Sequence, residues 1–147
     1  MEKPLKARIK WTENAAFVAE SGSGHAIVVD GPPEIGGRNL GPRPMELLLM
    51  GVGACSAVDV TLILRKARQQ VRDCWVELEA ERAETEPKVF TAIRMHFVVV
   101  GTRLAENHVK RAVELSAEKY CSASIMLARG GVAISHGYEI READAAA

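Results

Sequence analysis

Short alternations of apolar and polar residues open the chain and predict three β-strands, at residues 7–11, 16–20 and 25–30. Residues typical of turns separate them, Thr12-Glu-Asn after the first strand and Ser21-Gly-Ser-Gly after the second. Strands joined by such short turns pair with their neighbours. We therefore expect an antiparallel meander at the start of the chain.

A nearly uninterrupted apolar stretch, residues 45–64, predicts the longest helix. Pro44 suits its first position, where a missing N–H costs nothing, and the helix should run to about Gln69. The stretch is about as long as the ~20 residues that span a bilayer. Because Glu46 and Asp59 interrupt it, and because the flanking strands need a helix to pack on, we interpret it as the central helix of a soluble domain.

The second half of the chain resumes the strand alternation at residues 76–81 and 93–99, which predicts a hairpin turning around Glu86-Pro87. Thr102 is expected to cap a second helix that breaks near Tyr120. A short helix, a last strand and a frayed acidic tail should follow, at residues 122–129, 132–140 and beyond 140.

This element order segregates strands and helices, which predicts an α+β fold with a mainly antiparallel sheet and a long central helix. No repeat or internal boundary is evident, so we expect a single domain over residues 1–147. A chain of this length can bury a core without disulfides or metals.

Charge and cysteine content argue against several classes of protein. The 19 basic and 19 acidic residues balance, and no basic face stands out, which argues against a nucleic-acid partner. The odd number of cysteines and the polar start Met1-Glu2-Lys3 favour a cytoplasmic protein over a secreted disulfide scaffold. The four histidines show no metal-binding spacing and no Cys-x-x-Cys accompanies them, so we expect no metal or cofactor.

Cys55 is the first candidate for chemistry. Very small residues surround it, including Gly51 and Gly53, although a glycine inside a helix costs about 1 kcal/mol relative to alanine. Either another helix or a substrate therefore approaches this part of the helix closely. A free cysteine is also commonly a small core hydrophobe, and that alternative stays open.

Cys121 lies between a helix that ends at Tyr120 and one that begins at Ser122, where free N–H groups favour a thiolate. Lys119 adds a positive charge; the alternative is a buried cysteine in a kinked helix. Asp59, one helical turn after Cys55, could polarise that thiol or pair locally. The third cysteine, Cys74, has no comparable context and is interpreted as structural.

With these residues identified, the chain resembles the OsmC/Ohr family of cysteine-based hydroperoxide reductases, and in particular its OsmC-like branch. The resemblance lies in the element order and in two segments, Gly41-Pro-Arg-Pro-Met-Glu-Leu-Leu-Leu-Met-Gly-Val-Gly-Ala-Cys55 and Cys121-Ser-Ala-Ser-Ile-Met-Leu. It implies an intertwined homodimer with two interface sites. There Cys55 would attack an organic hydroperoxide, Cys121 would resolve it, and a dithiol reductant would regenerate both thiols.

The resemblance also implies an arginine and a glutamate that hold the first cysteine as thiolate. Arg38 lies in the matching loop, with Arg43 as the alternative, and Glu46 is the candidate glutamate. The family motif has its glutamate where this chain has Met45. On a continuous helix Glu46 is about 13 Å from Cys55 and on the opposite side, so the two cannot meet within one chain.

The sequence thus predicts a thiol-dependent redox protein that reduces small organic hydroperoxides. The alternative is a non-catalytic dimer of the same fold whose apolar groove binds a small apolar or lipid-like ligand.

Overall fold

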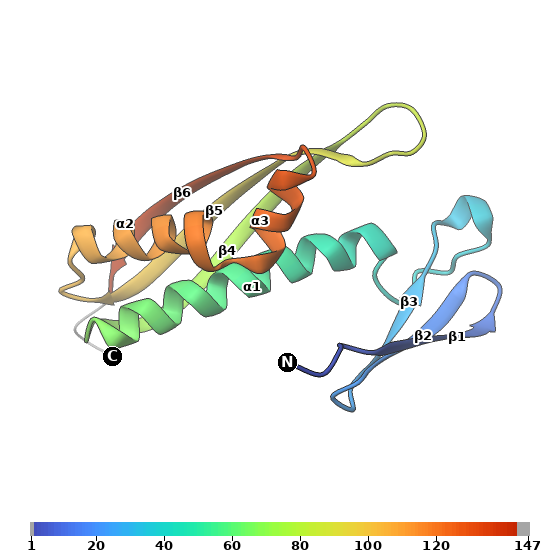
Figure 1. Ribbon diagram of the computed structural model, residues 1–147, viewed down its shortest axis with the longest axis horizontal. Helices are drawn as coiled ribbons and strands as arrows, with labels where there is room; N and C mark the ends of the chain where they lie inside the picture. Colours follow the sequence, from blue (N-terminus) through green and yellow to red (C-terminus); the bar gives the residue numbers. More distant parts are fainter. Residues whose placement is uncertain (1, 144–147) are drawn as a thin grey trace. The chain divides into compact units, whose positions relative to one another are not determined.

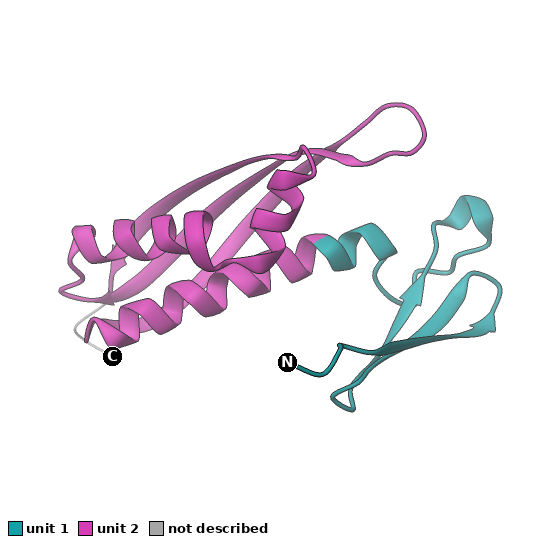
Figure 2. Ribbon diagram, viewed as in Figure 1, with its two compact units in different colours: residues 1–48 teal, residues 49–147 magenta. Residues whose placement is uncertain are grey.

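The computed structural model describes residues 2–143 and divides into two compact units, residues 1–48 and 49–147 (Figure 2). The long helix α1 (Pro44–Lys66) begins in unit 1 and continues through unit 2. The α+β fold class is confirmed, and within residues 2–143 three of the four strand pairings are antiparallel.

Unit 1 contains the predicted meander. Strands β1 (Ala7–Glu13), β2 (Ala16–Ser21) and β3 (Ala26–Asp30) pair in sequence order, all antiparallel (Figure 1). A single 3-10 turn, Pro33–Ile35, follows β3. Large apolar side chains on β1 and β3 are exposed, with Ile9 at 60% and Trp11 at 59% of their maximal accessible surface.

Asp30, at the end of β3, organises the loop that leads to α1. Its side chain is buried, and its carboxylate accepts hydrogen bonds from the backbone N–H groups of Gly31, Arg38 and Leu40. The pKa of Asp30 is lowered, chiefly by the Arg38 N–H, because these bonds favour the ionised form. The loop that carries Arg38 is therefore fixed at both ends by one carboxylate.

Unit 2 is a three-stranded sheet with helices on one face (Figure 1). Strands β4 (Gln70–Arg82) and β5 (Phe90–Thr102) form the predicted hairpin. Strand β6 (Ala133–Glu142) adds to β5 in parallel, a pairing that the alternation did not predict. Helices α1, α2 (Glu106–Leu115) and α3 (Ser122–Arg129) supply the second layer.

The core of unit 2 lies between α1, α2 and the central strand β5. Its large, fully buried apolar side chains include Val52, Val60, Leu64, Ile93, Phe97, Val99 and Val109. By length and composition α1 could also cross a membrane, a property that it shares with the core helices of soluble proteins. One side of α1 is buried, and Gly53 on that side packs against Leu78 of β4.

Two predicted boundaries were wrong. Thr102 does not cap a helix, because it pairs with Gln70 as the last residue of β5. Helix α2 begins at Glu106, and no side chain caps its start. Helix α1 ends at Lys66 rather than near Gln69, because Arg68 adopts a left-handed conformation (φ 57°) that turns the chain into β4.

Candidate functional site

The fold brings Cys55 and Cys121 together. One sulfur from each and a carboxylate oxygen of Asp59 all lie within 4.8 Å of one another. Helix α1 supplies Cys55 and Asp59, which are four residues apart and share one helical face. Cys121 comes from the residue just before α3. The proximity of these two cysteines, which the family resemblance implied, is confirmed.

Backbone N–H groups in the first turn of α3 act on both sulfurs. Cys121 is the N-cap residue, and its Sγ accepts from the backbone N–H of Ser124 at 3.4 Å. The backbone N–H of Ala123 acts to lower the pKa of Cys55, against the larger effect of burial. Such N–H groups have no partner within their own helix, and they favour negative charge at its N-terminus. The two thiols thus share one helix terminus.

A π-helical turn, Ser116–Tyr120, delivers Cys121 to this position. The Cys121 N–H bonds to the carbonyl of Ser116, five residues earlier, at 2.8 Å, and Cys121 itself is extended. The predicted helix break near Tyr120 is therefore confirmed, and it takes the form of a wider turn. Single π-helical turns are frequent at functional sites because they re-aim the residue that follows.

Two buried serines join the site, and the sequence reasoning missed both. The hydroxyls of Ser56 and Ser116 lie 2.9 Å apart, and Ser116 also donates to Asp59 Oδ2 at 3.1 Å. Neither serine exposes any surface. This chain of hydroxyls fixes the Asp59 carboxylate beside the sulfurs. The one available signal was that each serine occupies a buried position of an otherwise apolar helical face.

The two cysteines differ in access and in electrostatics. Cys121 is fully buried, whereas Cys55 is half-buried. Burial raises the pKa of the Cys55 thiol; the Ala123 N–H opposes this, and Cys121 and Asp59 reinforce it. Within unit 2 these surroundings keep Cys55 mainly protonated at neutral pH, so an efficient thiolate nucleophile needs a further positive charge.

Arg38 and Glu46, the other candidate residues, make their contacts inside unit 1. The Arg38 guanidinium is exposed and pairs with Glu13. Glu46 accepts the backbone N–H of Arg43 at 2.8 Å, the hydrogen bond of a capping box at the start of α1. The Arg43 side chain donates to Asn39 at 2.9 Å. Glu46 therefore stabilises the helix terminus and the loop before it.

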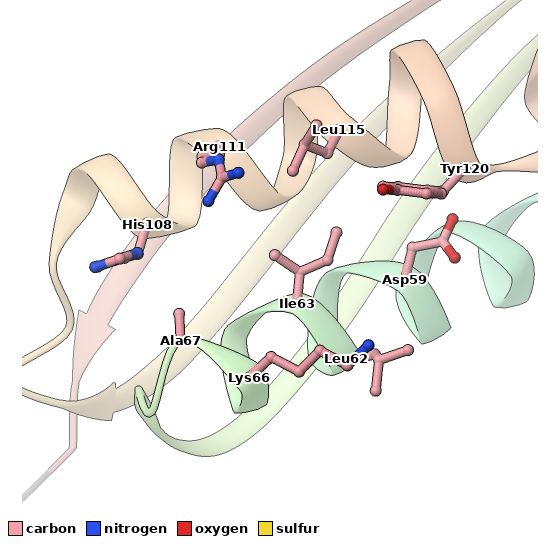
Figure 3. Close-up of a pocket in the computed structure, with 9 residues that line it drawn as sticks. All are labelled: Asp59, Leu62, Ile63, Lys66, Ala67, His108, Arg111, Leu115 and Tyr120. Carbon is pink, nitrogen blue, oxygen red and sulfur yellow. The ribbon is translucent and has the colours of Figure 1, made fainter.

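A groove of about 450 Å³ lies between α1 and α2. Figure 3 shows Ile63 and Leu115 facing each other across it, with Asp59 and Tyr120 at one end. The basic side chains that line it are Lys66, His108 and Arg111. Asp59, which also belongs to the cysteine cluster, lines one end of this groove, and His108 lies at the other end (Figure 3).

The fold and the cysteine pair define an OsmC-like protein. Residues 36–137 match the family described as OsmC-like protein, and the chain belongs to this family. Protein YhfA of Escherichia coli (strain K12) is 49% identical over 136 residues, which cover 92% of this chain and 98% of YhfA.

Solved structures extend the similarity. A hypothetical protein from Aquifex aeolicus VF5 is 31% identical with a TM-score of 0.84, and the match covers 97% of this chain and 100% of that one. An organic hydroperoxide resistance protein OsmC from Legionella pneumophila shares the fold at 21% identity, with a TM-score of 0.68 over 93% of this chain and 97% of that one.

Proposed function

We propose that this protein is a two-cysteine hydroperoxide reductase. The Cys55 thiolate attacks the terminal oxygen of an organic hydroperoxide and breaks the O–O bond, which yields a sulfenic acid on Cys55 and, after proton uptake, an alcohol. The Cys121 thiolate then attacks the sulfenic sulfur, forming a disulfide and releasing water. An external dithiol reduces that disulfide and is itself oxidised.

The observation that carries this proposal is the pairing of an accessible and an inaccessible thiol at one helix terminus. Cys55 is half-buried and Cys121 fully buried, so a peroxide meets Cys55 first. The two sulfurs lie within 4.8 Å, close enough for a disulfide after a small side-chain movement. The Ala123 N–H at Cys55 favours the ionised thiol that the first step requires.

The groove supports an organic substrate. Its walls include Leu62, Ile63 and Leu115, and a bulky apolar group gains free energy there that hydrogen peroxide cannot gain. We therefore assign to the protein a preference for organic hydroperoxides. Comparison of the second-order rate constants for cumene hydroperoxide and hydrogen peroxide tests it, and a faster reaction with hydrogen peroxide would contradict it.

The Cys55–Cys121 disulfide is tested by mass spectrometry of protein treated with one equivalent of hydroperoxide. We expect a Cys55–Cys121 linkage in the wild type and in Cys74→Ser. In Cys121→Ser, one equivalent should leave Cys55 as the sulfenic acid, and a further equivalent should oxidise it to the sulfinic acid. If Cys55 stays unoxidised in the wild type, or if it is overoxidised equally with and without Cys121, then Cys121 is not the resolving cysteine.

A ligand-binding protein on the same fold is the second candidate, and the apolar groove together with the raised pKa of Cys55 favours it. This function predicts that a Cys55→Ala, Cys121→Ala double variant binds an apolar fluorescent probe as well as the wild type does. It also predicts that the wild type does not turn over hydroperoxides. Peroxidase turnover by the wild type decides between the two functions.

A further inference from the structure

We propose that the reduced cysteine site is also a metal site, in which Cys55, Asp59 and Cys121 bind one Zn²⁺ ion. Two thiolates and one carboxylate are ligand types that zinc accepts, and open zinc sites use three protein ligands with water in the fourth position. This inference does not depend on peroxidase activity, because it concerns binding to the dithiol alone.

The geometry needs little change to accept the ion. Ligands at 2.0 to 2.3 Å from a tetrahedral zinc lie about 3.3 to 3.8 Å from one another. The three ligand atoms already lie within 4.8 Å of one another. Cys55 and Asp59 project from one face of α1, so rotamer adjustments of these half-buried side chains can close the remaining gap.

The surrounding hydrogen bonds are of the kind that orients metal ligands. Ser116 holds Asp59 at 3.1 Å, and Ser56 holds Ser116 in turn. The Ser124 N–H binds the Cys121 sulfur at 3.4 Å. Two of the three ligands, Asp59 and Cys121, therefore have a supporting hydrogen-bond donor, as metal ligands in proteins commonly do.

Charge favours a divalent cation at this point. Once a metal ion has displaced the two thiol protons, the two sulfurs and the Asp59 carboxylate carry three negative charges, which a divalent cation offsets. In residues 2–143, Asp59 takes part in no salt bridge, so no basic side chain of the described chain occupies that position. The Cys121 thiol, which points at the Val52 carbonyl, would release its proton when the metal binds.

Metal binding and disulfide formation exclude each other. The disulfide uses both sulfurs in a covalent bond and leaves Asp59 as the one remaining ligand. Bound zinc should accordingly slow the oxidation of Cys55, and oxidation of the dithiol should release the ion. The site would then respond to the metal supply as well as to peroxide.

The test uses Co²⁺ as a spectroscopic probe and Zn²⁺ in equilibrium dialysis, with fully reduced, chelator-treated protein. We expect one ion per chain and a near-ultraviolet thiolate-to-cobalt charge-transfer band that zinc abolishes. Cys55→Ser and Cys121→Ser should each weaken binding at least tenfold and reduce the band. Asp59→Asn should weaken binding at least threefold and leave both thiolate contributions in the band.

Cys74→Ser is the matched control, because Cys74 is the third free cysteine and lies on β4 outside the cluster. It should bind cobalt like the wild type. Three results would each contradict the proposed zinc site. They are loss of the cobalt band in Cys74→Ser, full metal affinity in Asp59→Asn, and equal metal binding by the oxidised protein. Circular dichroism confirms that each variant is folded, and peroxidase assays in chelator report separately on the proposed function.

Discussion

Cys55 has a thiol whose reactivity depends on charges beyond its own helix. Its pKa is raised, above all by burial, from an ordinary value of 9.0. We propose that Arg38 supplies the compensating charge in the assembled protein, as the family resemblance implies. The rate of Cys55 oxidation against pH then reports on Arg38, since the reacting species is the thiolate.

We expect Arg38→Ala to shift the pH profile of Cys55 oxidation upward. Without the guanidinium, the rate constant should rise about tenfold per pH unit until the pH exceeds 9.0, because the thiolate fraction rises in proportion below the pKa. The wild type should level off at lower pH. Stopped-flow measurements with a neutral hydroperoxide check this, and Arg43→Ala, measured in parallel, tests the alternative arginine. Identical profiles for wild type and Arg38→Ala would remove Arg38 from the site.

Ser116 is the second residue whose role can be measured directly. Ser116→Ala leaves the buried Ser56 hydroxyl and the Asp59 carboxylate without their shared partner. The free energy of unfolding should fall by about 1 to 3 kcal/mol, as expected for a buried group that loses its hydrogen bond. Urea denaturation measures the change. Ser122→Ala, at an exposed position of α3, should change it by less than about 0.5 kcal/mol.

At the scale of elements, α1 has two faces with different requirements for small residues. A Cβ on Gly53 would lie 2.7 Å from Leu78 Cδ1 and 3.5 Å from Val76 Cγ1, so Gly53 is small because β4 packs on it. A Cβ on Gly51 would meet nothing within 4 Å. The small residues around Cys55 predicted that another element packs closely on this helix. On the Gly53 side, that element is β4 of the same chain.

These two glycines form a matched pair of tests. Gly53→Leu should destabilise the protein by roughly 1 to 3 kcal/mol or more through overpacking against Leu78. Gly51→Ala should be neutral or stabilising by up to about 1 kcal/mol, because alanine is the better helix former and has free space. Chemical denaturation at one protein concentration compares them. Equal costs at both positions would contradict the assigned faces.

For the whole molecule, the exposed side of α1 predicts an assembly. Leu48, Met50 and Val58 expose 50%, 57% and 63% of their surface on this helix. Apolar side chains exposed together in this way suit packing against a second copy. We propose that the protein is an intertwined homodimer.

Sedimentation at sub-micromolar concentration tests this assembly, and we expect a dimer. Val58→Asp should dissociate or unfold it, because a carboxylate would be buried in the interface. Val89→Asp is the control, since Val89 is a similarly exposed valine (51%) in the β4–β5 hairpin. A stable, folded wild-type monomer at that concentration would disprove the obligate dimer.

The sequence by itself determined the strands of the meander, the long helix, the β4–β5 hairpin and the two cysteines worth considering. These features depend on local alternation, on turn residues and on small residues inside one helix, all of which a linear chain displays. The break at Tyr120 was equally local, because the residues on its two sides have different helical patterns.

Only the tertiary structure decided the rest of the site. Ser56 and Ser116 are 60 positions apart, and a hydroxyl in an apolar stripe gives no indication of its partner until two helices meet. The parallel addition of β6 depends on the helices that cross between it and β5. Asp59 lies beside both cysteines only because the packing of α1 against the start of α3 brings Cys121 to it. The sequence displays side chains and their periodicity, whereas contacts between distant elements exist only after packing selects one arrangement.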